Sequence, residues 1–85
     1  MEGIVYVLQS LKDYKTYTGS TDNLNRRLEE HNAGKVRATK YRRPFKLIYT
    51  EKFIDLNFAR RREHFLKTAS GRRELRKILK NIIAG

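Results

Sequence analysis

Polar side chains fall on helix faces that should be apolar, and their types suit proton transfer and phosphate binding. At about 100° per residue, a helix over residues 23–32 places Arg27 and His31 in the same sector as Leu24 and Leu28. A polar group on an inward face costs free energy unless it is paired or used in a site. A guanidinium matches two phosphate oxygens, and an imidazole can accept or relay a proton. A semi-buried structural histidine is the alternative interpretation of His31.

A carboxylate repeats this pattern in a second expected helix. Glu63 shares a face with Ala59 and Leu66, whereas His64 lies on the opposite face and is expected at the surface. Two interpretations are open. Either an ion pair between Arg27 and Glu63 joins the two helices, or a functional site uses both charges.

Two tyrosines lie in expected strands close to the first helix. Because alternate residues of a strand share a face, Tyr6 points with Leu8 and Tyr17 points with Gly19. A glycine at residue 19 lets a ligand approach the backbone closely. Tyrosines on a sheet usually serve packing, but here they complete an inward polar set. That set is Tyr6, Tyr17, Arg27, His31 and Glu63, and we expect it to converge on one concave surface of the sheet.

Short segments with strand and helix signals must position these side chains. Strands are expected at residues 3–9, 16–20 and 45–53, the first two as an antiparallel hairpin. Helices are expected at 23–32, capped by Thr21-Asp22, at 55–67, capped by Asp55, and at 72–84, after an interruption at Ser70-Gly71. The order ββαβαα predicts an α+β fold with a three-stranded antiparallel sheet flanked by helices. A length of 85 residues fits one domain over 1–85.

Positive charge is concentrated in the second part of the chain. The formal net charge is +11, and residues 35–85 carry 16 of the 20 basic side chains but only 4 of the 9 acidic ones. A polyanion is the expected partner, because each neutralised phosphate releases a counterion, although cations could also serve solubility alone. Nucleic acid is favoured over a membrane surface. The expected nucleic-acid contacts are Lys35, Arg37, Lys40, Arg42, Arg43, Lys46, Arg60 and Arg61.

Several classes of protein are excluded by composition. The chain has no cysteine, which excludes a disulfide framework and a thiolate zinc site. Its longest purely apolar run, residues 4–8, is far too short to span a bilayer, and its first residues lack a basic signal-peptide region. A cytoplasmic location is therefore expected.

Four segments of the chain carry a family resemblance. Ile4-Val5-Tyr6 follows Gly3, and Tyr17-Thr18-Gly19 places its tyrosine 11 residues after the first. The helical stretch 23–31 and the segment 59–63 contain the inward arginine and glutamate. Together these segments resemble the GIY-YIG nuclease family, above all its small standalone bacterial members, over nearly the whole chain.

This resemblance implies a metal-dependent endonuclease that hydrolyses phosphodiester bonds in DNA during repair or processing. Arg27 matches the catalytic arginine of the family, with His31 one turn later, and Glu63 matches the metal-binding glutamate. One Mg²⁺ or Mn²⁺ suits a single carboxylate, because such ions keep most of their waters. Either Tyr6 or Tyr17 could be the general base if a nearby cation lowers the phenol pKa from about 10, and His31 could accept or relay the proton.

The same sequence features are compatible with two other functions. The same basic surface could belong to a non-catalytic nucleic-acid-binding module, or to a module that takes its specificity from a targeting protein. The inward tyrosine, arginine and glutamate favour the enzyme, because binding alone does not require a carboxylate next to phosphate.

Overall fold

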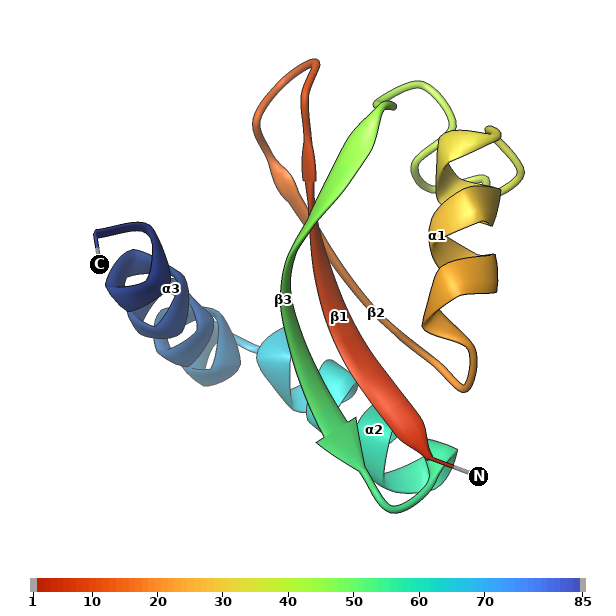
Figure 1. The fold of residues 1–85 in the computed structure, drawn as a ribbon. Coiled ribbons are helices and arrows are strands. Elements are labelled where there is room, and N and C mark those ends of the chain that lie inside the picture. The colour runs from red at the N-terminus through yellow and green to blue at the C-terminus, as the bar shows by residue number, and fades with distance from the viewer. Residues whose placement is uncertain (1, 85) are drawn as a thin grey trace.

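The computed structural model, which describes residues 2–84, contains one antiparallel sheet with helices on both faces (Figure 1). In chain order the elements are β1 (Gly3–Ser10), β2 (Thr16–Thr21), α1 (Leu24–Asn32), β3 (Phe45–Phe53), α2 (Leu56–Leu66) and α3 (Ala69–Ala84). The predicted α+β class and the order ββαβαα are confirmed. In the described residues no helix has the length and apolarity that a membrane crossing requires.

The strand order β2-β1-β3 leaves β2 at an open edge of the sheet. Pairing of β1 with β2 sets Tyr6 opposite Gly19 and Leu8 opposite Tyr17. Directly opposed residues of an antiparallel pair project to the same face. All four residues therefore lie on one face of the sheet. This agrees with the prediction from the alternation of side chains along each strand.

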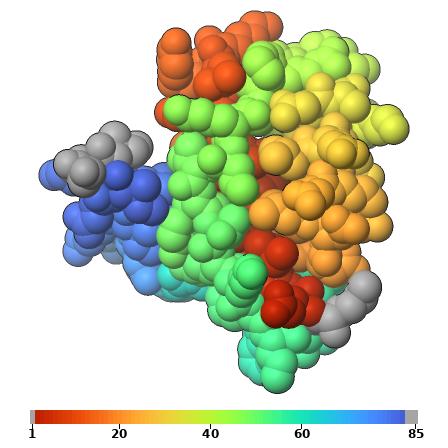
Figure 2. All heavy atoms as spheres, viewed as in Figure 1, coloured from red at the N-terminus to blue at the C-terminus, as the bar shows by residue number. Residues whose placement is uncertain are grey.

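Each face of the sheet has its own apolar core. Tyr6, Leu8 and Phe45 are buried on the α1 face, where leucines of α1 pack against them. Val5 and Val7 lie on the other face, beneath α2 and α3. The space-filling view shows the same layers, with β3 running between α1 on the right and α3 on the left (Figure 2). Of the two tyrosine candidates, Tyr6 thus belongs to the core beneath α1, and the partly buried Tyr17 packs against that core.

Side-chain caps mark the starts of α1 and α2, and the cap of α1 differs from the predicted one. Asp55 caps α2 as expected, since its Oδ1 accepts a hydrogen bond of 3.0 Å from the Phe58 amide. At α1 the cap is Asn23 rather than Thr21-Asp22, because Asn23 Oδ1 accepts from the Arg26 amide at 3.1 Å. The Thr21 hydroxyl instead accepts from the Asn23 amide and orients the cap itself.

The predicted interruption at Ser70-Gly71 is wrong, because both residues lie inside α3. The break comes earlier, where the Thr68 hydroxyl accepts a hydrogen bond of 3.1 Å from the Gly71 amide, as an N-cap does. Gly71 serves close packing instead. A Cβ at residue 71 would lie 1.8 Å from the carbonyl oxygen of Phe65, so only glycine lets α3 approach the end of α2.

Candidate active site

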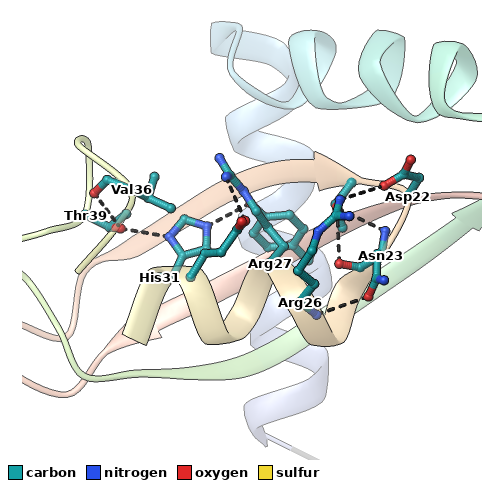
Figure 3. A network of polar contacts seen from close by, with 10 residues as sticks. Asp22, Asn23, Arg26, Arg27, His31, Val36 and Thr39 are labelled. Atoms are coloured by element: carbon teal, nitrogen blue, oxygen red, sulfur yellow. Dashed lines mark hydrogen bonds and ion pairs between the residues drawn. The ribbon is translucent and has the colours of Figure 1, made fainter. Parts of the chain in front are cut away.

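Three of the predicted site residues form one hydrogen-bonded network beneath α1. Tyr6 Oη lies 2.8 Å from His31 Nε2, and Arg27 Nε donates to Tyr6 Oη at 3.4 Å. Tyr6 and His31 are 1% and 0% exposed. Figure 3 shows His31 extending from α1 between Arg27 on one side and Thr39 on the other. The helical spacing that placed Arg27 and His31 on one face therefore brings both to the same phenol.

Burial sets the protonation of this network. Burial, followed by the nearby Arg27 charge, lowers the pKa of His31 to about 4, so the imidazole is neutral at neutral pH. Burial also raises the pKa of Tyr6, an effect that the Arg27 hydrogen bond opposes. The Tyr6 phenol is consequently protonated at rest and can lose its proton only to a nearby acceptor. His31 Nε2 is that acceptor by position.

Tyr17 lies beside this network on the same face of the sheet. Its ring centroid is 5.2 Å from that of His31, and Lys67 Nζ lies 5.6 Å from the centroid of the Tyr17 ring. Because Lys67 follows α2, the half-buried Tyr17 connects the α1 side of the sheet to the α2 side.

Glu63 reaches the site from the opposite face, and two side chains hold its carboxylate. The Ser20 hydroxyl donates to Oε1 at 2.5 Å, and Lys67 Nζ donates to Oε2 at 2.6 Å. Neither Ser20 nor Lys67 is among the predicted site residues. The spacing of four residues between Glu63 and Lys67 was an available signal, because such pairs are neighbours on a helix.

Convergence on one concave surface stays a prediction, and the structure brings the two groups together from opposite faces of the sheet. Tyr6 and Tyr17 project toward α1, whereas Ser20, being out of phase with Tyr17 along β2, projects toward Glu63 on α2. Lys67 joins the two groups beside the open edge of β2, because its Nζ lies 2.6 Å from Glu63 Oε2 and 5.6 Å from the centroid of the Tyr17 ring. The charge of Glu63 also raises the pKa of Tyr6, by less than burial and Tyr17 do.

The alternative of an ion pair between Arg27 and Glu63 is wrong. Arg27 pairs with Glu30 at 3.2 Å, and Glu63 pairs with Lys67. The Arg27 side chain is 35% exposed, so its guanidinium can still be reached by a ligand. The two charges therefore do not neutralise each other across the helices.

Gly19 has a physical reason to be glycine. A Cβ at residue 19 would lie 2.5 Å from Tyr6 Oη and 2.6 Å from the ring carbon that bears it. A side chain at this position would therefore displace the phenol from Arg27 and His31. The glycine of the Tyr17-Thr18-Gly19 segment makes room for the tyrosine of the neighbouring strand.

Two hollows follow the edge of β2, one on each side of Gly19. A polar hollow of about 450 Å³ is lined by Ser20 and by three arginines, Arg26, Arg27 and Arg60, among others. A groove of about 560 Å³ runs between residues 16–18 of β2 and α3, with Lys67, Arg72 and Arg76 above a leucine floor. The side chains of consecutive strand residues point alternately to one face of the sheet and then the other. Because residues 16–18 all line this groove, the groove runs along the edge of β2 and not over a single face.

Most of the predicted nucleic-acid contacts are exposed, and one has a structural partner. The exposed ones are Lys35, Arg37, Lys40, Arg43, Lys46, Arg60 and Arg61. Arg42 instead pairs with Asp13 at 3.1 Å, and its carbonyl accepts a hydrogen bond from Ser10. Arg42 thus anchors the basic loop to the β1–β2 hairpin. Arg61 lies over the Phe58 ring, whereas Arg60 lines the polar hollow beside Arg27.

The donors around Glu63 fit a hard divalent cation. In residues 2–84 no three histidine, aspartate or glutamate side chains cluster as metal ligands. A cation at Glu63 would have a carboxylate and the Ser20 hydroxyl available, and it would keep water or substrate oxygens as its other ligands, as Mg²⁺ commonly does. The Lys67 ammonium already shows that this carboxylate attracts positive charge.

Comparison with known proteins agrees with this geometry. The sequence model of the GIY-YIG catalytic domain matches residues 2–77. A UPF0213 protein of Staphylococcus haemolyticus is 44% identical over 75 residues, which are 87% of this chain and 90% of that protein. A UPF0213 protein of Natronomonas pharaonis is 45% identical over 67 residues, 78% of each.

A solved structure is similar as well. The solution NMR structure of a UPF0213 protein from Bacillus halodurans has a TM-score of 0.54 and 33% identity, and covers 92% of this chain and 85% of that one. The matched range, residues 2–77, includes both tyrosines, Arg27 and Glu63 of this chain. With its fold, its tyrosine pair and its extent all in agreement, the chain belongs to the GIY-YIG family.

Proposed function

We propose that this protein is a metal-dependent endonuclease that hydrolyses phosphodiester bonds in DNA, in repair or processing. The observation that supports the proposal is the Tyr6, Arg27 and His31 network, with the Glu63 carboxylate held by Ser20, the next residue of β2 after Gly19, which faces Tyr6. Phosphodiester hydrolysis needs a base for water, positive charge at the phosphate and stabilisation of the leaving oxygen. This arrangement has a group for each need.

Each residue has a defined part in the proposed reaction. Arg27, which lines the polar hollow, binds two non-bridging oxygens of the scissile phosphate. Glu63 and Ser20 would hold a divalent cation, which would supply positive charge to the phosphate and to the leaving oxygen. Tyr6 takes a proton from the attacking water while its own proton passes to His31 Nε2, 2.8 Å away. The water oxygen bonds to phosphorus, and the bond from phosphorus to the leaving oxygen breaks.

The two hollows provide a path for the DNA strand on both sides of this chemistry. Arg26, Arg27 and Arg60 lie on one side, and Lys67, Arg72 and Arg76 lie on the other. Cations on both sides of the reacting phosphate would hold the neighbouring phosphates. The exposed cations of the loop at 35–43 extend this surface beyond α1.

The proposal is tested first with the wild-type protein. We expect end-labelled DNA to be cut in Mg²⁺ or Mn²⁺ and to stay intact when a chelator is present. Single-stranded, duplex and branched DNA and an RNA of the same sequence should be compared, since charge does not distinguish them. If every substrate stays intact in both metals while binding persists, the protein is a non-catalytic nucleic-acid-binding module instead.

Salt dependence tests the proposed path through the groove. If four to six phosphates are contacted, log K for DNA should fall against log salt with a slope of roughly −3 to −5. The double variant Arg72→Ala/Arg76→Ala should weaken binding and make this slope shallower by about 1 to 2. Fluorescence anisotropy in a salt series measures both quantities.

A matched control comes from the same helix. Arg73→Ala/Lys77→Ala removes the same charge from exposed residues of α3 that are not among those lining the groove. We expect this control to keep nearly the wild-type slope. Equal effects of the two double variants would mean that α3 contributes only general charge and that the strand does not follow the groove.

A further inference from the structure

The buried hydrogen bonds around His31 have a direction that can be derived by accounting for each hydrogen. Arg27 Nε donates to Tyr6 Oη at 3.4 Å, which leaves the phenol hydrogen to be donated onward. His31 Nε2 lies 2.8 Å from Tyr6 Oη, and His31 Nδ1 lies 2.8 Å from Thr39 Oγ1. The Thr39 hydroxyl in turn donates to the Val36 carbonyl oxygen at 3.4 Å. One continuous chain of donors therefore runs from Arg27 to Val36.

The opposite direction leaves the phenol hydrogen without an acceptor. If Thr39 donated to His31 Nδ1, then Nε2 would carry the hydrogen and donate to Tyr6. The phenol hydrogen would then lack an acceptor in the described network, and Val36 would lose its hydroxyl donor. An unsatisfied donor on a side chain that is 1% exposed is costly. The forward direction is therefore the stable one.

We propose that Thr39 is a positioning residue that fixes His31 in its Nδ1–H tautomer. In this tautomer Nε2 has a free lone pair directed at the Tyr6 hydroxyl, so it can accept the phenol proton during the reaction. The catalytic part of this inference rests on the proposed function. Its structural content, the tautomer of a buried imidazole, stands on the hydrogen bonds alone.

Packing alone does not explain why residue 39 is a threonine. It is 0% exposed, yet it lies in a cationic loop where the neighbouring Lys40 and the nearby Arg37 are exposed. Valine has nearly the same shape and would fill the same space without a polar atom to satisfy. A threonine here is explained by its hydroxyl, which is the acceptor for His31 Nδ1. The loop expected to bind DNA thus also supplies the group that orients the proton acceptor.

Two variants and one spectroscopic measurement test the proposal. In the wild-type protein, nitrogen-15 NMR of the histidine rings should show His31 protonated at Nδ1 and not at Nε2. The exposed His64 is an internal reference without this constraint. Thr39→Ser keeps the hydroxyl and should keep the tautomer, whereas Thr39→Val removes the acceptor and should change the His31 signals. This measurement needs neither metal nor substrate.

Cleavage assays then connect the tautomer to the reaction. Thr39→Val should cut DNA about 10- to 100-fold more slowly, by analogy with the loss found when the hydrogen-bond partner of a metal-bound histidine is removed. Thr39→Ser should recover most of the rate, and both variants should bind DNA as the wild type does. An Nε2–H tautomer in the wild type, or a Thr39→Val protein with unchanged tautomer and rate, would overturn the proposal. A correct tautomer in a protein that cuts nothing would contradict the proposed function and the catalytic role, while leaving the hydrogen-bond assignment in place.

Discussion

Glu63→Gln is expected to lower metal-dependent cleavage by at least about 10³-fold, because a bound cation stabilises transition-state charge by several kcal/mol. The substitution keeps the shape of the side chain, and its amide oxygen can still accept from Ser20, but the negative charge that attracts the cation is lost. DNA binding should change little, since the arginines of both hollows remain. Cleavage rates and DNA affinity, measured on the same preparation, check both expectations.

Stability should not confound this experiment. The ion pair that the substitution breaks is partly solvated, because Lys67 is 48% exposed, so its loss should cost at most about 1 kcal/mol. Glu29→Gln is a suitable control, since it makes the same chemical change at an exposed position of α1. Thermal melts should show both variants folded. Undiminished cleavage by folded Glu63→Gln would assign the activity to a contaminant and favour the non-catalytic binding module.

Much of the fold could be predicted because each element carries its own local signal. Residues 45–53 are rich in β-branched and aromatic side chains and form β3 with the expected bounds. Asp55 caps the helix that it was expected to cap. The cap of α1 was misplaced because residues 21–23 are all good capping residues, and only the backbone geometry selects Asn23. The start of α3 was misplaced because Gly71 is a packing glycine and not a helix breaker.

The candidate site could be predicted only in part, for a geometric reason. Periodicity identifies which face of its own helix or strand a residue occupies, and this was enough to find Arg27, His31 and Glu63. It does not say how two faces of a sheet meet, so the link through Lys67 beside the edge of β2 was missed. Thr39 gave no signal at all, because a loop has no periodicity that separates a buried hydroxyl from an exposed one.

Arg27→Ala is expected to lower the cleavage rate by about 10²- to 10³-fold, the usual effect of removing one preorganised group at developing charge. Two losses combine in this variant. The guanidinium no longer binds the phosphate, and Tyr6 loses the donor that opposes the rise of its pKa by burial. The ion pair with Glu30 is about one-third exposed, so stability should fall by at most about 1 kcal/mol.

The neighbouring arginine provides the control for this last experiment. Arg26 also lines the polar hollow, and it pairs with Asp22 rather than with any group of the Tyr6 network. Arg26→Ala should therefore weaken DNA binding about as much as Arg27→Ala does. It should leave the cleavage rate of bound DNA near the wild-type rate. Arg27→Lys should restore binding but only part of the rate, because an ammonium cannot bind two phosphate oxygens as a fork does. Equal rates for Arg26→Ala and Arg27→Ala at saturating protein would mean that Arg27 acts as surface charge, and Tyr6 and His31 would then work without it.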